Sequence, residues 1–307
     1  MSIDLILRTV EQGLAFGLLA MGVYLTFRIL DFPDLTVEGS FPLGAVVTAR
    51  FIVMGTNPII ATLIAVIAGG CAGIITGLIN TKLKIAGLLA GILTMTSLYS
   101  INLRIMGKPN IGLIKSPSII SIIEGWGINP DYVSLGSFII ILFVIKILTD
   151  YFLHTEMGMS LRATGNNPVM IESLGVNTDV MKIMGLAIAN SLVALSGSLV
   201  AQYQGFADAG MGLGMIVIGL ASVIIGEVVI RTSKIPFATL GVILGAIIYR
   251  LAIAIALQMG FAPTDLKIVT AILVILSLGA PTLRKFMIQD EFAEHLLERG
   301  VVDVDNK

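Results

Sequence analysis

Long apolar runs, separated by short polar connections, repeat along the chain from its start to about residue 283. Each run has roughly the 20 residues that a helix needs to cross a ~30 Å hydrocarbon core. The pattern therefore predicts an all-α, polytopic bundle of about nine transmembrane helices. The predicted spans are approximately 5–30, 36–54, 58–81, 85–106, 132–153, 180–203, 214–231, 236–259 and 266–283.

The same pattern predicts one transmembrane domain, residues 1–285, and a polar, acidic tail, residues 286–307. Two connections are longer than the rest, at 107–131 and 154–179. The first apolar run lacks a preceding basic segment and a small-residue cleavage site, so we expect a retained span rather than a signal peptide.

Lys and Arg are unevenly distributed between the two sides of this nine-span arrangement, and such a bias marks the cytoplasmic side. It predicts an outside N-terminus, an inside C-terminus and a cytoplasmic 154–179 loop. The predicted cytoplasmic set is Arg28, Lys82, Lys84, Arg162, Lys182, Arg231, Lys234, Arg284 and Lys285, and the opposite set is Arg8, Arg104, Lys108, Lys115 and Lys267.

Composition agrees with a membrane protein, since 56% of residues are hydrophobic and 13% are charged, against about 25% charged in soluble domains. The net charge of −1 offers no basic surface for nucleic acid. The single cysteine, Cys71, lies within an apolar run and cannot form an internal disulfide. No Cys/His cluster has metal-binding spacing, so we expect no metal and no cofactor bound by this chain.

Carboxylates and a proline interrupt the apolar pattern between residues 31 and 40. Asp31, Asp34 and Glu38 lie around Pro33, which removes a backbone donor and breaks helices. Carboxylates in a membrane face protein, water or the interface, because exposure to lipid is costly. The segment is either an interfacial turn or a broken helix that presents polar groups to a translocation path.

The loop after residue 154 carries the start and stop signals of a short amphipathic helix at 169–174. Asn167-Pro168 is a typical start and Gly175 a typical stop. Its apolar side chains Met170, Ile171 and Leu174 are expected to be exposed and to need a partner surface. That surface is either the base of the bundle or another protein.

Small and polar residues within the spans have two interpretations. Glycines at intervals of four, such as Gly69/Gly73/Gly77, indicate close helix packing or the lining of a solute path. Asn102, Asn190, Gln202 and Gln204 can hydrogen-bond between helices, and Asn190 and Gln202 are the better site candidates because their helix follows the cytoplasmic loop. Glu227 and Arg250 could pair across helices or extend toward the interface.

Several motifs occur in an order that resembles one family. G-x-x-L-R-A-T-G-N-N-P at 158–168, followed by G-V-N at 175–177, resembles the cytoplasmic coupling loop of an ATP-binding-cassette permease family that serves branched-chain amino acid, ribose and nucleoside importers. D-L-T-V-E-G-S-F-P-L-G-A at 34–45 resembles that family's early segment, and 221–226 with 237–246 resembles its late helix pair. The form D-F-P-D-L-T-V-E-G at 31–39 resembles a subgroup linked to amino acids, including aromatic ones.

The resemblance implies a permease subunit that imports a small polar solute, an amino acid being favoured, by alternating access. It is not itself an enzyme: no G-x-x-x-x-G-K-[ST] loop occurs, so ATP is expected to be used by a separate pair of cytoplasmic ATPase subunits. Other expected partners are an external solute-binding protein and a second permease chain, with a homodimer favoured. The expected substrate-path residues are Asp34, Thr36, Glu38, Asn190 and Gln202; the expected ATPase-coupling residues are Arg162, Asn166, Asn167, Pro168, Met170, Ile171, Glu172, Leu174 and Gly175.

Two other classes of protein compete with this prediction. An ion-coupled secondary transporter would use intramembrane carboxylates, but it would normally show interrupted helices in paired repeats, and only one interrupted segment is evident. An intramembrane enzyme is less favoured, because no catalytic cluster has suitable spacing.

Overall fold

The computed structural model describes residues 3–114, 116–124, 130–232 and 234–262, together with residues 265, 268, 270–272 and 275. Within this part of the chain the structure is a bundle of long helices with one small β-ribbon. The elements in chain order are α1 (Ile3–Tyr24), η1 (Leu25–Ile29), α2 (Val37–Val53), α3 (Pro58–Thr81), α4 (Gly87–Met106), β1 (Asn110–Gly112), α5 (Ile119–Glu124), α6 (Pro130–His154), α7 (Glu156–Asn166), α8 (Pro168–Ser173), α9 (Thr178–Gln204), β2 (Phe206–Asp208), α10 (Met215–Val229) and α11 (Ile235–Gln258).

Eight of the nine predicted spans correspond to helices. Six helices in the described residues are long and apolar enough to cross a membrane: Asp4–Ile29, Pro58–Thr81, Gly87–Met106, Val133–His154, Thr178–Gln204 and Ile235–Gln258. The predicted spans 36–54 and 214–231 become the shorter helices α2 and α10, of 17 and 15 residues. The ninth predicted span, 266–283, and the tail from 286 lie largely or wholly outside the described residues.

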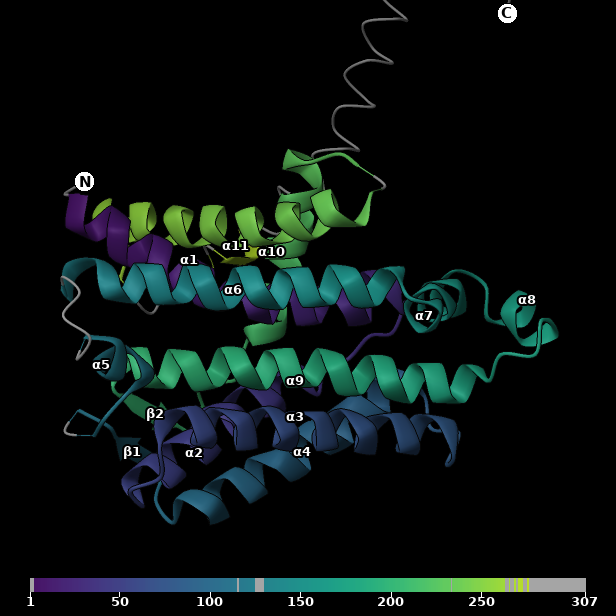
Figure 1. The fold of residues 1–307 in the computed structure, drawn as a ribbon, viewed down its shortest axis with the longest axis horizontal. Helices are drawn as coiled ribbons and strands as arrows, with labels where there is room; N and C mark the ends of the chain where they lie inside the picture. The colour runs from purple at the N-terminus through teal and green to yellow at the C-terminus, as the bar shows by residue number, and fades with distance from the viewer. Residues whose placement is uncertain are drawn as a thin grey trace, which may run out of the picture.

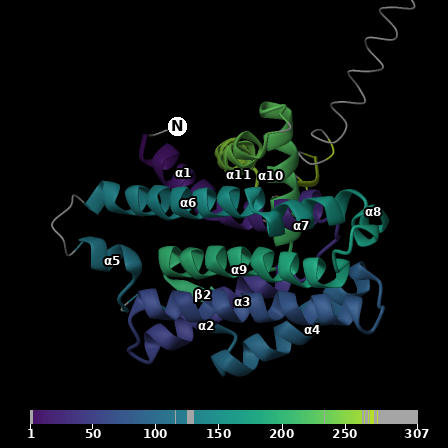
Figure 2. The same cartoon turned by 45° about the vertical axis from the view of Figure 1, so that its right-hand side comes forward.

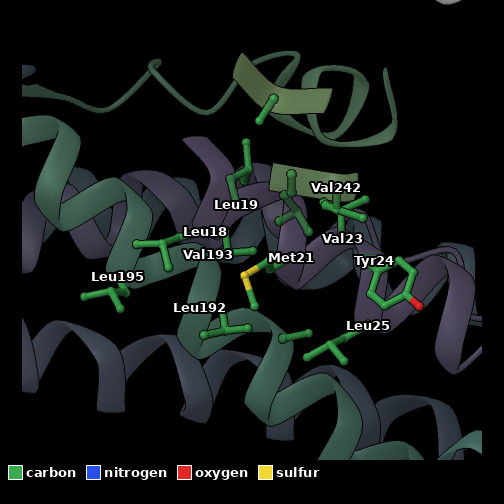
Figure 3. Close-up of a cluster of buried hydrophobic side chains, with 14 of the residues drawn as sticks. Leu18, Leu19, Met21, Val23, Tyr24, Leu25, Leu192, Val193, Leu195 and Val242 are labelled. Carbon is green, nitrogen blue, oxygen red and sulfur yellow. The ribbon is translucent and has the colours of Figure 1, made fainter. Parts of the chain in front are cut away.

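Helix α9 runs through the middle of the bundle (Figure 1). On one side it packs against α1, with α6 and α11 beyond, and on the other against α2 and α3, with α4 outermost. Figure 2 shows the same order after rotation. Much of the core lies around α1, which packs against α9 on one side and α11 on the other; Leu18, Met21 and Val193 lie on the α9 side, and Val242 lies near Val23 (Figure 3).

Glycines let the helices approach closely, as the four-residue spacing predicted. A Cβ atom at Gly73 of α3 would lie 2.2 Å from the Leu186 carbonyl oxygen of α9, and one at Gly69 would lie 2.5 Å from that of Asn190. Apolar attraction between helices is weak in lipid, so such close van der Waals packing holds the bundle together. This glycine row packs helices and does not line a path.

The two ends of the bundle are built differently. At one end, β1 pairs antiparallel with β2, with Ile111 opposite Ala207, and so joins the end of α4 to the end of α9. At the other end α7 and α8 project beyond the long helices, far from the N-terminus (Figures 1 and 2). The N-terminal end of α1 and the helices α7 and α8 therefore lie at opposite ends of the bundle.

Candidate functional site

The chain breaks its helical path between η1 and α2 and runs there as non-helical backbone, on which Asp31 and Pro33 are exposed. The last turn before the break is the wide π-helical turn η1, a feature often found at functional sites. Asp31 then adopts a left-handed conformation with φ of 52°, and Pro33 prevents a return to helix. Phe32, Asp34 and Thr36 are buried. The helical path is therefore interrupted here, as either sequence interpretation requires, and a translocation path at this segment stays a prediction.

Asp34 is the centre of a buried hydrogen-bond network, and only 2% of it is exposed. One carboxylate oxygen, Oδ1, accepts from the backbone N–H of Thr36 at 2.9 Å, which fixes the start of α2. The other, Oδ2, accepts from Asn190 Nδ2 on α9 at 2.8 Å. Ser40 of α2 donates to Asn190 Oδ1 at 2.7 Å, which completes the bridge between α2 and α9.

Thr36 extends this network to two further helices. Its hydroxyl lies 2.7 Å from that of Thr76 on α3, and Thr76 donates to Thr94 on α4 at 2.9 Å. Thr76 and Thr94 were not predicted as site residues, because each is an unremarkable threonine within an apolar span. Their role depends on three helices meeting, which no local pattern reports.

Glu38 lies in the first turn of α2 and faces a different neighbour. Its Oε1 accepts from the backbone N–H of Gly214 at 3.0 Å, which ties the loop after β2 to the start of α2. The carboxylate lies beside a cavity of about 350 Å³. The cavity walls are Glu38, Gly39, Pro42, Met95, Thr96, Tyr99, Asn102, Ala209 and Leu213.

Gln202 does not join the Asp34 network. Its Nε2 donates to Thr62 on α3 at 2.9 Å, and its Oε1 accepts from the Ile119 backbone N–H of α5 at 3.0 Å. Ser198, one turn earlier on α9, accepts from Thr48 and lies 3.0 Å from Thr62. The five predicted path residues therefore divide into three places: Asp34, Thr36 and Asn190 together, Glu38 at the cavity, and Gln202 near the β1–β2 end.

The predicted helix in the 154–179 loop is present as α8. The Asn167 side chain accepts from the Met170 backbone N–H at 3.0 Å, Pro168 is the first helical residue, and Gly175 follows with φ of +85°. These are the expected start and stop signals. Val169, Met170 and Leu174 are exposed, as is Glu172.

One prediction in this helix is wrong. Ile171 is 8% exposed, against 67% for Leu174, so it is part of the protein interior and not of the exposed face. The reason is that the helix has only six residues and lies against the bundle on the side of Ile171. The exposed residues Asn166 and Asn167 connect α7 to α8, and half-buried Arg162 lies within α7.

Helix α7 packs directly on the backbone that leads to Asp34. A Cβ atom at Gly165 would lie 2.1 Å from the Ile29 carbonyl oxygen, so any larger residue would collide with η1. Buried Leu161 of α7 and Leu30 both pack against Gly185 of α9. These contacts connect the exposed 154–179 loop to the segment that immediately precedes Asp34.

Ion pairs lie at the same end of the bundle. Arg28 of η1 pairs with Glu227 of α10, and Lys82 and Lys84 both lie within 4 Å of Asp179 at the start of α9, at 3.6 and 3.8 Å. The sequence left Glu227 and Arg250 either to pair across helices or to extend toward the interface; Glu227 pairs across helices with Arg28, and Arg250 does not pair with it. Arg250 instead lies over the Phe16 ring, 3.6 Å from its centroid, because α11 packs against α1 there.

Among the described residues no group of three or more His, Cys, Asp or Glu side chains could hold a metal ion.

Comparison with known proteins identifies the family. Residues 5–278 match the family described as the permease component of branched-chain amino acid transport systems. The chain is 44% identical over 278 residues to a tyrosine transport system permease protein of Clostridioides difficile, covering 91% of this chain and 92% of that protein.

More distant relatives are also named as import permeases. The chain is 24% identical to a ribose import permease protein of Haemophilus influenzae, covering 80% of this chain and 75% of that protein. It is 27% identical to an autoinducer 2 import system permease protein of Photorhabdus laumondii, covering 75% and 66%. This chain therefore belongs to the branched-chain amino acid and ribose family of ATP-binding-cassette importer permeases, and it is a multi-pass protein of the cell membrane.

Proposed function

We propose that this chain is the membrane-spanning subunit of an ATP-driven importer of a small polar solute, with an amino acid favoured, and that a separate ATPase drives it through α7 and α8. The observation that carries the proposal is the apolar face of α8. Val169, Met170 and Leu174 are 76%, 55% and 67% exposed, on a helix that projects from the end of the bundle. Exposed apolar side chains gathered at one place are typical of a protein interface.

The contacts of α7 give a physical reason for coupling at this place. An ATPase that moved α8 would also move α7, since Asn166 and Asn167 join the two helices directly. Helix α7 contacts η1 at Gly165 and Ile29, five residues before Asp34. A packed contact of this kind transmits displacement because densely packed interiors deform little. We expect this displacement to change the orientation of Asp34, Thr36 and the start of α2.

An amino acid is the favoured solute because the Clostridioides relative, at 44% identity, is named for tyrosine transport. The subunit would act with two ATPase subunits, an external solute-binding protein and a second copy of itself. The binding protein would provide the high-affinity step, and the permease would bind the solute weakly, since a solute shifts alternating states only through its differential affinity for them.

The test uses the complete transporter in proteoliposomes. Met170→Asp and Leu174→Asp place a charge on the proposed docking face, and Met54→Asp, at an exposed position beyond α2, is the matched control. We expect the two α8 variants to lose ATPase co-purification and ATP-dependent tyrosine uptake, with the control unchanged. Full uptake by both α8 variants would overturn the docking surface, and uptake driven by an ion gradient without the ATPase would overturn the proposed function.

A further inference from the structure

We infer that the cavity beside Glu38 binds the ammonium group of a solute that also carries an apolar or aromatic body. The inference rests on the proposed import function and names what the permease itself recognises. It draws on three features of the cavity: its walls, its acceptor groups and its lack of basic side chains.

Three segments far apart in the sequence enclose the cavity. The first turns of α2 provide Glu38, Gly39 and Pro42, and the loop after β2 provides Ala209 and Leu213. The third wall is α4, through Met95, Thr96, Tyr99 and Asn102. The volume of about 350 Å³ falls within the ~300–1,000 Å³ range of small-molecule sites.

One polar atom of the wall is a buried acceptor that lacks a partner among the described residues. Asn102 is fully buried, and its Nδ2 donates to the Gly39 carbonyl at 3.3 Å. That bond orients the amide and leaves Oδ1 buried with no hydrogen-bond partner in the described part of the chain. Leaving a buried polar atom unpaired costs about 1–3 kcal/mol, so a donor from a bound molecule would be favoured there.

Glu38 supplies the second acceptor. One of its oxygens accepts from Gly214, and no ion pair to its carboxylate occurs among the described residues. An ammonium group has three donors and a positive charge, so it can satisfy a free carboxylate oxygen and an amide oxygen together.

The rest of the wall sets the class of solute. None of the cavity residues is Lys, Arg or His. A solute whose only charge is negative would meet the Glu38 carboxylate with nothing to offset the repulsion. Pro42, Met95, Leu213 and the ring of Tyr99 provide apolar contact for a hydrocarbon or aromatic body. The cavity thus favours amines with apolar side chains over sugars and simple acids.

The experiment places the permease–ATPase complex in nanodiscs, without the solute-binding protein, and measures ligand binding by saturation-transfer NMR. The probes are L-tyrosine, tyramine, which lacks the carboxylate, and 3-(4-hydroxyphenyl)propionate, which lacks the amine. We expect signals from tyrosine and tyramine and at least a tenfold weaker signal from the propionate, in line with the loss of a charged hydrogen bond.

Variants then assign the binding to Glu38 and Asn102. Glu38→Gln keeps an acceptor for Gly214, so the fold should persist, and it should reduce tyrosine binding roughly tenfold or more. Asn102→Ala should also weaken tyrosine binding. Glu124→Gln, on exposed α5, makes the same chemical change away from the cavity and should bind as the wild type does.

Uptake by the complete transporter distinguishes a failure of the proposed function from a failure of the ammonium site. If the wild type imports no amino acid, the proposed function is wrong. If the wild type imports tyrosine but gives no tyrosine signal in nanodiscs, or if Glu38→Gln binds tyrosine unchanged, or if the propionate binds as well as tyramine, the ammonium site is wrong and the proposed function stands.

Discussion

Gly165 of α7 lies against the Ile29 carbonyl so closely that a Cβ atom there would be 2.1 Å from the oxygen. Residues 29 and 165 are far apart in the sequence, yet their contact joins the exposed loop to the broken helix. If this contact transmits the ATPase motion, altering it should separate ATP hydrolysis from transport without removing any group that binds solute.

Gly165→Val should therefore reduce solute uptake at least tenfold while ATP hydrolysis by the assembled complex continues. The reason is that the added side chain forces α7 away from η1, since a Cβ contact below 3 Å cannot be accommodated without a shift. The measurement is the ratio of solute imported to ATP hydrolysed in proteoliposomes. Gly136→Val on α6, where a Cβ atom would meet nothing within 4 Å, is the control. An unchanged ratio in Gly165→Val would remove this contact from the mechanism.

Asp34→Ala should impair uptake and stability together. The change leaves the Thr36 N–H without its acceptor and removes one acceptor of the Asn190 side chain, and a buried polar group left unpaired costs about 1–3 kcal/mol. Thermal unfolding of Asp34→Ala, Asn190→Ala and the double variant gives their coupling energy. We expect more than about 1 kcal/mol, above the average for hydrogen bonds between transmembrane helices. Additive effects would show that the two side chains do not act together.

Gly73→Leu should destabilise the bundle more than any change on its lipid-facing surface. The side chain would collide with the Leu186 carbonyl of α9, and overpacking of this kind typically costs about 1–3 kcal/mol, sometimes more. The measurement is the thermal midpoint of the purified protein in detergent, with Gly136→Leu as the matched substitution. Equal midpoints for the two variants would mean that α3 and α9 do not pack as closely as the structure has them.

Charges on the coupling surface should matter for the partner and not for folding. Arg162→Ala and Glu172→Ala should lower uptake while the subunit still inserts, because Glu172 is exposed and Arg162 makes no ion pair among the described residues. The readout is nucleotide hydrolysis per solute imported. Arg104→Ala and Glu124→Ala remove exposed charges elsewhere and should behave as the wild type does. If both test variants hydrolyse the normal amount of ATP per solute imported, Arg162 and Glu172 do not contribute to ATPase docking.

Local signals explain what the sequence could predict. Asn167, Pro168 and Gly175 specify α8 through their own backbone preferences, so its bounds were predictable. Proline and three carboxylates between apolar runs similarly marked the place after η1 where the helix ends, but they left open whether it is an interfacial turn or a broken helix. The predicted Asp34 and Asn190 lie 156 residues apart, and their contact depends on α9 running beside the start of α2.

The rest of the site depends on which helices become neighbours. Ile171 was misassigned because a six-residue helix has too little periodicity to reveal its buried face. The environment of Arg250 was left open by the sequence, because its guanidinium lies over Phe16 only as a result of α11 packing against α1. Tyr99 and Asn102 have no local signal of a site at all, since the cavity exists only where α2, α4 and the loop after β2 meet.

The central claim is that α8 faces the cytoplasm and is covered by the ATPase. Cys71 is the single cysteine, so Cys71→Ser gives a background in which Met170→Cys can be labelled alone, with Met54→Cys at the opposite end for comparison. We expect a membrane-impermeant maleimide to label Met54→Cys on intact cells, and Met170→Cys only on inverted vesicles stripped of the ATPase. Labelling of Met170→Cys from outside, or equal labelling with the ATPase bound, would contradict the account.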